Sequence, residues 1–332
     1  RGLLGPNVSP EMGGGGRGAL DTVLAMEGLG TGCTDLGFLI ALNAHLWGTV
    51  LPLATLGSDE QRAAWLPPLL AGDMVGAHCI TEPDAGSDVH GMTTTIAEDG
   101  GGLLVDGHKH FITGASRAGL FLVYGRDPAA GDDALSAVLL PADTPGLTVT
   151  DQPKLGLTGA PMGEVRLEGC RVGRDQLLGR AGAGMAQFAT ALEWERSCIF
   201  APVLGAMQRQ LDRAVRRARQ RRQFGQPIGR FQSVANRIVD MRMRLDVGRL
   251  LLYQVASLKH DGGRAPLESS QAKLHISEAF VSSSLDAMQI HGGTGYLADS
   301  DEARDLRDAP AGTLFSGTSE IQRVIIARFL GL

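Results

Sequence analysis

The chain has 332 residues, which corresponds to two or three domains. With 43% apolar and 20% charged residues, its composition is that of a folded globular protein and excludes a disordered or collagen-like chain. A net charge of -5 disfavours nucleic acid or an anionic membrane as a partner.

The cysteine pattern and the N-terminal residues indicate a cytoplasmic protein. Four widely separated cysteines, without a CxxC pair, predict buried free thiols rather than a disulfide framework or a metal site. The first residues lack the apolar core of a signal peptide, and the absence of an initial Met suggests that the chain begins inside a longer product. The uncharged stretch 37–57 is long enough to span a membrane, but Asn43, His45 and Pro52 interrupt it and favour buried helices.

Residues 1–75 predict a small helical domain. Ser58, followed three residues later by Gln61, is the signature of a helix N-terminus with a capping box. The segment Gly28–Cys33 is a near miss to the dinucleotide-binding GxGxxG motif, and no strand precedes it, so we do not expect dinucleotide binding there.

Residues 76–179 predict a β domain, because short apolar segments recur about every ten residues between turns. This spacing is typical of an antiparallel barrel or sandwich. The expected strands contain residues 111–113, 120–124, 137–140, 147–150 and 163–167.

Residues 180–332 predict long helices suited to a four-helix bundle. One apolar face is formed by residues at spacings of three, four and seven, namely Val234, Ile238, Met241, Leu245, Leu252 and Val255. The expected fold is therefore α+β, with an N-terminal helical domain, a central β domain and a C-terminal bundle.

Several segments carry residues suited to ligand binding, although each has a simpler structural interpretation. The loop 78–88 could direct N–H groups and hydroxyls at a ligand, or could be a capped turn. Arg213, Arg217 and Arg221 share one helix face, which is either solvated or holds phosphate oxygens. The glycine-rich segment 289–296 either ends a helix or lets a backbone approach a ligand.

The segment Glu193–Arg196 places two carboxylates in an otherwise apolar helix. Burying a carboxylate is costly unless it is paired. One glutamate could therefore be a general base, or both could face solvent or pair with Arg196.

Taken together, these segments resemble the acyl-CoA dehydrogenase superfamily over essentially the whole chain. The matching motifs, in the family's order, are TEPDAGSD at 81–88, FIT at 111–113, RRQFG at 221–225 followed by Phe231-Gln232, QIHGGTG at 289–295 and GTSEIQR at 317–323. The family's N-terminal domain normally starts a few dozen residues earlier, so the resemblance implies that the first helix or two are missing here.

The resemblance implies FAD as the cofactor. The cofactor contacts that it implies are His78, Cys79, Ile80, Thr81, Ser87, Phe111, Ile112, Thr113, Arg221, Gln223, Phe224, Phe231, Gln232, Gln289, Ile290, Gly292, Gly293, Thr318 and Glu320. The implied contacts with the substrate are Ser87, Glu193, Trp194, Arg196 and Ser316.

The catalytic base departs from the commonest family pattern. Many members carry a glutamate immediately before the Gly-Thr-Ser of the last motif, where this chain has Ser316. Members similar to isovaleryl-CoA and long-chain acyl-CoA dehydrogenases instead carry the base on the earlier helix, directly before an arginine. Glu195 followed by Arg196 matches that pattern, so the resemblance implies α,β-dehydrogenation of an acyl thioester with Glu195 as the base.

Two alternatives remain. Because some relatives without the usual glutamate are flavin monooxygenases, Ser316 keeps that activity open. A non-catalytic homologue is the other alternative. The thioester carrier, coenzyme A or an acyl-carrier protein, is open as well. The resemblance further implies an electron-transfer flavoprotein or another electron acceptor, and a homodimer or homotetramer.

Overall fold

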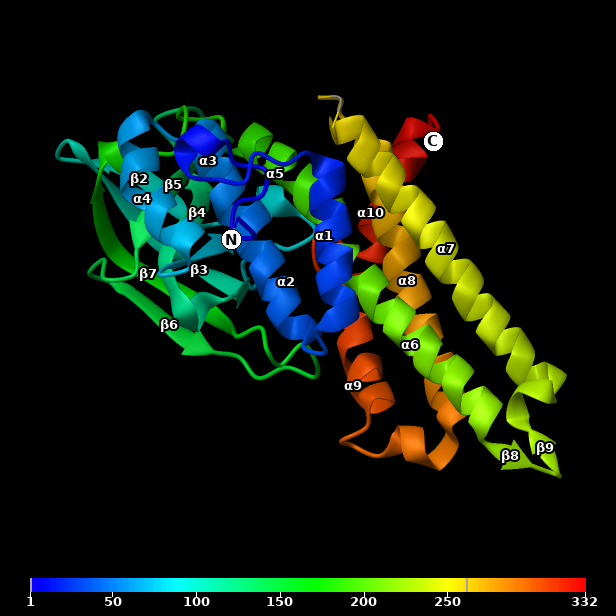
Figure 1. Cartoon of the computed structure of the whole chain (residues 1–332). Helices are drawn as coiled ribbons and strands as arrows, with labels where there is room; N and C mark the ends of the chain where they lie inside the picture. The colour runs from blue at the N-terminus through cyan, green and yellow to red at the C-terminus, as the bar shows by residue number, and fades with distance from the viewer. Residues whose placement is uncertain (1, 261) are drawn as a thin grey trace. The chain divides into compact units, whose positions relative to one another are not determined.

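The structure, a computed structural model, describes residues 2–260 and 262–332 (Figure 1). The chain divides into two compact units, and each is described by itself. The first unit contains the residues up to Gly18 together with 41–154 and 160–195. The second contains 19–40, 155–159 and 196–332.

The first unit contains a seven-stranded sheet in the order β1-β4-β2-β3-β7-β6, with β5 paired to β4. All five predicted strands are present. The strands are β1 (Val75–Cys79), β2 (Thr95–Asp99), β3 (Gly102–Thr113), β4 (Ala118–Arg126), β5 (Leu135–Pro141), β6 (Leu147–Asp151) and β7 (Met162–Gly173).

The expectation of a purely antiparallel barrel needs correction, because the sheet is mixed and forms only a half-closed barrel. Strand β1 pairs with β4 in parallel, with Ala77 opposite Phe121. The long connection through β2 and β3 separates them, and such a crossover permits parallel pairing. Alternation of apolar and polar residues reveals that a segment is a strand but not the direction of its partner, so the sequence could not distinguish the two arrangements.

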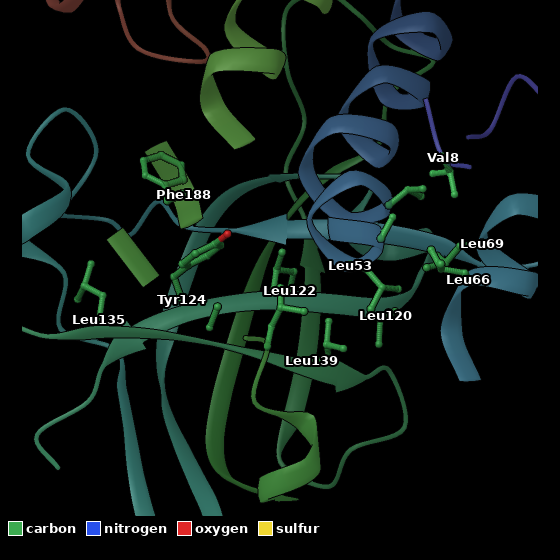
Figure 2. Packing of buried hydrophobic residues seen from close by; sticks show 14 of the residues in the cluster. Val8, Leu53, Leu66, Leu69, Leu120, Leu122, Tyr124, Leu135, Leu139 and Phe188 are labelled. Atoms are coloured by element: carbon green, nitrogen blue, oxygen red, sulfur yellow. The ribbon is translucent and has the colours of Figure 1, made fainter. Parts of the chain in front are cut away.

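Helices of the first unit cover this sheet. They are α3 (Leu51–Leu56), α4 (Asp59–Ala71) and most of α5 (Gly184–Cys198). The predicted capping box of α4 is confirmed: Ser58 accepts from the Gln61 N–H and the Gln61 side chain accepts from the Ser58 N–H. Figure 2 shows the core that results, in which Leu53, Leu66 and Leu69 from these helices pack towards Leu120 and Leu122 of β4.

The predicted apolar stretch 37–57 forms a nearly continuous helical segment. It consists of α2 (Leu36–His45), a π-helical turn at Leu46–Val50, and α3. By length and composition it could cross a membrane, but 72% of its most apolar window is buried within the fold, as in the core helix of a folded protein.

The second unit is helical. Helices α6 (Ala201–Gln220), α7 (Gln232–His260) and α8 (Pro266–His291) pack side by side (Figure 1), and α10 (Ser319–Phe329) packs on α8. The short helix α9 (Asp301–Asp308) and the hairpin β8 (Arg222–Gln223) and β9 (Gln226–Pro227) complete it. Of the predicted apolar face of α7, Met241, Leu245, Leu252 and Val255 are buried, whereas Val234 and Ile238 are half-buried.

Helix α1 (Ala19–Gly32) packs against α6 and α7 in this second unit. The contact is backbone to backbone: a Cβ on Gly30 would lie 2.2 Å from the Pro202 carbonyl oxygen, and a Cβ on Gly205 would lie 2.2 Å from that of Glu27. Gly30 of the Gly28–Cys33 segment therefore serves close helix packing, and no strand precedes the segment in the part of the chain that the structure describes.

Candidate active site

The end of strand β1 packs on the π-helical turn Leu46–Val50. Gly76 and His78 lie on the same face of β1, since side chains alternate along a strand. A Cβ on Gly48 would lie 2.7 Å from the His78 Cβ, and a Cβ on Gly76 would lie 2.5 Å from the Thr49 Cγ2. Only glycine allows the strand and the helix to approach this closely.

His78 and Glu195 meet in this region. The His78 Nδ1 lies 3.6 Å from the Glu195 Oε2, and their side chains are only 10% and 15% exposed. The His78 ring packs edge-on against Tyr124, with ring centroids 5.3 Å apart. It also packs at a tilt against Phe188, with ring centroids 5.8 Å apart. Burial, aided by the charge of Glu195, raises the pKa of Tyr124 above its ordinary range. The His78 ring beside Glu195 is therefore enclosed by two aromatic side chains.

The neighbouring turn of α5 is also held by the π-helix. Trp194 stacks on Trp47, with ring centroids 5.6 Å apart and the rings inclined by 16°. The Trp47 indole N–H donates to the Asn43 Oδ1 at 2.9 Å. His45 is a core residue: its Nδ1 accepts from the Gly76 N–H at 2.9 Å, and burial lowers its pKa to about 4. The π-helix thus fixes both the His78 strand and the Glu195 helix.

A buried ion pair organises the loop that follows β1. The Lys109 Nζ donates to the Glu82 Oε1 at 2.8 Å and to the Ile80 carbonyl at 3.1 Å. Glu82 also accepts from the backbone N–H groups of Thr93 and Thr94, at 2.6 and 3.0 Å. Burial raises the pKa of Glu82, but the Lys109 charge and these hydrogen bonds outweigh it and hold the pKa at about 2.

This loop is joined to the segment around Phe111. The Thr81 carbonyl accepts from the His110 N–H at 2.8 Å, so two predicted cofactor-binding segments lie side by side. Phe111 is 56% exposed and has a φ of 58°, a conformation that is strained for an aromatic residue. Its N–H donates to the Gln152 Oε1 at 3.2 Å, which supports the strained backbone.

In the second unit, the last motif is organised around Ser316. This residue also has a positive φ, 54°, and its carbonyl accepts from the Arg196 Nε at 3.4 Å and from the Gln322 Nε2 at 3.3 Å. The Gln322 Nε2 donates to the Gly317 carbonyl as well, at 2.8 Å. Thr318 caps α10 by accepting from the Ile321 N–H. The Glu320 carboxylate interacts with the backbone N–H of Glu320 and with the Thr318 side chain, and these hydrogen bonds lower the pKa of Glu320.

The three arginines that the sequence places on one helix face have different surroundings: Arg213 and Arg217 contact other helices, and Arg221 is exposed. Arg213 pairs with Glu302 at 2.9 Å and with Asp305 at 2.5 Å, and Arg217 donates to the His291 carbonyl at 3.3 Å. These two arginines hold α6 to α9 and to the end of α8, which neither sequence interpretation anticipated. Arg221, by contrast, is exposed at the start of the β8–β9 hairpin.

The hairpin and the end of α8 carry the remaining predicted residues. Phe224 is 93% exposed with a φ of 49°, and its ring lies 6.0 Å from that of Phe231 in an edge-on contact. Helix α8 ends at His291, and Gly292 follows with a φ of 63°. A Cβ on Gly292 or Gly293 would meet nothing within 4 Å. The positive φ of Gly292 favours glycine there, whereas no packing among the described residues requires glycine at position 293.

The first unit therefore brings together the segments His78–Ser87 and Phe111–Thr113 and the α5 residues up to Glu195, whereas the rest of the predicted set lies in the second unit. Sequence reasoning missed the Lys109–Glu82 pair and the contact of His78 with Glu195. A lysine two residues before the predicted strand 111–113 was a usable signal for the first. The second had none, because residues 78 and 195 meet only through the tertiary fold.

Three family models match the chain in succession: the acyl-CoA dehydrogenase N-terminal domain over residues 1–73, the middle domain over 77–170 and the C-terminal domain over 182–331. The chain is 40% identical to an L-prolyl-[peptidyl-carrier protein] dehydrogenase of Pseudomonas fluorescens, over 100% of this chain and 88% of that protein.

Two solved structures are similar throughout. The prolyl acyl carrier protein oxidase AnaB is 44% identical, with a TM-score of 0.97 over 100% of this chain and 88% of its own. A structure of PigA with FAD and proline is 40% identical, also with a TM-score of 0.97, over 100% of this chain and 87% of its own.

Proposed function

The chain belongs to the acyl-CoA dehydrogenase family, and from that premise we propose that it oxidises a prolyl thioester carried by a carrier protein, with Glu195 as the base. Its enzyme class is that of FAD-dependent oxidoreductases. The observation that carries the proposal is the placement of the Glu195 carboxylate, 15% exposed, beside the buried His78 ring.

The residues present suit FAD. Phe111 offers an exposed aromatic face on a strained, buttressed backbone, which is the shape that a flat ring system requires for stacking. The loop that starts at Thr81 is fixed to the neighbouring strand by the His110 N–H and by the Lys109–Glu82 pair. Arg221 is exposed and can hold the cofactor's pyrophosphate, and the N-terminus of α10 at Thr318 provides N–H donors.

We assign the remaining FAD contacts to the motif residues by their resemblance to the family motifs. They are His78, Cys79, Ile80, Ser87, Ile112, Thr113, Gln223, Phe224, Phe231, Gln232, Gln289, Ile290, Gly292, Gly293 and Glu320.

The reaction removes two hydrogens from adjacent carbons of the acyl group. Glu195 takes the α-hydrogen as a proton, and its electron pair forms the new α,β double bond as the β-hydrogen departs as hydride. Bound FAD supplies the acceptor for that hydride. The Glu195 side chain is only 15% exposed, and carboxylates buried to this extent are frequent at functional sites, which favours Glu195 over a surface acid.

Ser316 and Arg196 act on the thioester end of the substrate. The charge that develops on the thioester oxygen requires a backbone N–H donor, and we assign the N–H of Ser316 to that role. Arg196 and Gln322 donate to the Ser316 carbonyl and so fix the peptide that follows this N–H. Ser87, Glu193 and Trp194 contact the acyl arm in this proposal.

The carrier-borne prolyl group is favoured over a fatty acyl-CoA by the whole-chain identity of 40% to 44% with proteins named for prolyl-carrier substrates. One of these relatives is named a dehydrogenase and the other an oxidase, so the electron acceptor is either an electron-transfer flavoprotein or O₂. We further propose a homodimer or homotetramer located in the cytoplasm.

Anaerobic flavin bleaching tests the proposal. Prolyl-carrier protein, prolyl-CoA and butyryl-CoA are mixed in turn with the FAD-loaded enzyme, and the absorbance of oxidised flavin is followed. We expect rapid bleaching with the prolyl-carrier protein and a loss of at least 10³-fold in Glu195→Gln with FAD retained, because an amide cannot accept the proton.

Glu98→Gln is the matched control, because it makes the same change on an exposed residue of β2. Unchanged bleaching in Glu195→Gln would remove Glu195 from the mechanism. Faster bleaching with butyryl-CoA would replace the prolyl substrate by a fatty acyl one. Hydroxylated product formed in the presence of O₂ would favour the monooxygenase alternative that Ser316 raises.

A further inference from the structure

His78 is held in one orientation by its surroundings. Its ring lies between Tyr124, edge-on at 5.3 Å, and Phe188, tilted by 33° at 5.8 Å. Gly48 of the π-helix supports the other side, since a Cβ there would overlap the His78 Cβ. The ring therefore has little room to rotate, and its two nitrogens face different surroundings.

The two nitrogens differ in their partners. Nδ1 lies 3.6 Å from the Glu195 Oε2, whereas Nε2 is buried without a hydrogen-bond partner among the described residues. A buried N–H without an acceptor is more costly than a buried lone pair without a donor. The tautomer that carries its hydrogen on Nδ1, directed at Glu195, is therefore the favoured one.

The imidazole is neutral in this environment. Burial lowers the pKa of His78, the charge of Glu195 on α5 raises it, and the charge of Lys109 on β3 lowers it. The other groups packed against the ring carry no charge: they are the Tyr124 ring of β4 with its neutral hydroxyl, Phe188 of α5 and Gly48.

We propose that His78 is a positioning residue for Glu195, whose Nδ1–H holds the carboxylate oxygen Oε2 in place for proton abstraction. This inference rests on the proposed function, in which Glu195 is the base. The contact of 3.6 Å is longer than a hydrogen bond, and such contacts tighten when substrate fills a site. A neutral donor orients the carboxylate and stabilises its charged form, whereas an imidazolium would weaken it as a base by forming a full ion pair.

Substitutions at His78 test the role. His78→Phe keeps an aromatic ring between Tyr124 and Phe188 but removes both nitrogens, and His78→Asn retains an N–H near the position of Nδ1. With prolyl-carrier protein and the FAD-loaded enzyme, we expect His78→Phe to reduce its flavin about 10- to 100-fold more slowly, with little change in KM. The acidic limb of its pH–rate profile should move to higher pH, because the carboxylate loses the donor that stabilises its charged form. His78→Asn should restore most of the rate.

Two outcomes would overturn the proposal. The first is a His78→Phe enzyme with the wild-type rate and pH profile. The second is equal slowing in the Phe and Asn variants without a change in pH profile, which would show that His78 only fills space in the core. If Glu195→Gln is inactive while His78→Phe is normal, the positioning role fails and the proposed function stands. If Glu195→Gln is active, the proposed function itself fails.

A measurement on the unaltered enzyme covers the case in which the Phe variant does not fold. Nitrogen NMR of the ¹⁵N-histidine-labelled FAD-loaded protein distinguishes the two tautomers, and the His78→Asn spectrum identifies the signal. We expect the Nδ1–H form of His78. An Nε2–H form would contradict the proposal.

Discussion

Lys109 and Glu82 form an ion pair of 2.8 Å in which both residues are at most 4% exposed. Lys109 comes from the middle of β3, and Glu82 from the loop after β1. Since the same lysine also donates to the Ile80 carbonyl, one ammonium group fixes the backbone of the first segment to which we assign FAD contacts. A charge buried in this way is stable only while its partner is present.

Removing one member of this pair should therefore destabilise the protein strongly. We expect Lys109→Met to lower the free energy of unfolding by about 3–5 kcal/mol and to weaken FAD retention, because Glu82 is left as a buried, unpaired charge. The double variant Lys109→Met with Glu82→Leu should recover much of that stability. Urea unfolding at pH 7 checks both. Equal loss in the single and double variants would show that the hydrogen bonds from Thr93 and Thr94 matter more than the ion pair.

The same pair predicts acid sensitivity. The pKa of Glu82 in the folded protein is about 2, compared with 4.5 for an ordinary glutamate. Its contribution to stability is therefore fully present above about pH 4.5 and is lost as the pH falls towards 2, because the unfolded chain then takes up the proton first. Glu82→Gln should flatten the pH dependence of the unfolding midpoint in that range. A wild-type slope in the variant would contradict this prediction.

Gly48→Ala tests the close approach of the π-helix to β1. The added Cβ would lie 2.7 Å from the His78 Cβ, so we expect a net loss of about 1–3 kcal/mol and slower flavin reduction as His78 is displaced. Gly28→Ala is the matched control, since nothing lies within 4 Å of its added Cβ in α1, and it should gain about 1 kcal/mol from helix propensity. Thermal unfolding compares the two, and a stabilised Gly48→Ala enzyme with normal activity would refute the steric argument.

Lys273 on α8 is fully buried, and its Nζ has no hydrogen-bond partner among the described residues. Burial, together with the charge of Arg196, lowers its pKa to about 8. Between pH 8 and 10.5 the unfolded chain binds the proton that the folded protein has lost, so stability should rise with pH across that range. Lys273→Met should remove this rise and add about 3 kcal/mol at pH 7. Unfolding curves of the wild-type protein and Lys273→Met at pH 7 and pH 10 test this prediction. A variant less stable than the wild type would contradict it and would indicate that Lys273 has another role.

Ser316→Ala should cost less than tenfold in the rate of flavin reduction. The variant keeps the backbone N–H and the carbonyl that Arg196 and Gln322 hold, and alanine tolerates a φ of 54° about as poorly as serine. Gln322→Leu should be more damaging, because it removes both donors to the Ser316 and Gly317 carbonyls. A loss of several orders of magnitude in Ser316→Ala would indicate that the hydroxyl takes part in the chemistry.

The local features of the fold were the ones that the sequence could predict. The capping box at Ser58 and the strand around Leu122 depend on neighbouring residues, and the structure confirms them. The parallel pairing of β1 with β4 depends on residues about 40 positions apart, and no periodicity encodes it.

The candidate site shows the same division. The motifs placed Glu195 and Phe111 among the functional residues, but they could not show that His78 lies beside that carboxylate or that Gln152 supports the strained Phe111 backbone. The arginine face illustrates the limit most clearly: Arg213 and Arg221 look alike in sequence, yet acidic side chains on α9 engage the first and leave the second exposed.

The π-helical turn Leu46–Val50 has a consequence for how this protein can vary in length. A π turn accommodates one residue more than an α-helix does, and α2 and α3 continue on either side of it. Deleting a single residue there would relax the turn to α-helical geometry and rotate everything beyond it by about 100°. Trp47 and Gly48 could not then both keep their contacts, so we expect homologous chains to tolerate exchanges in this segment more readily than insertions or deletions.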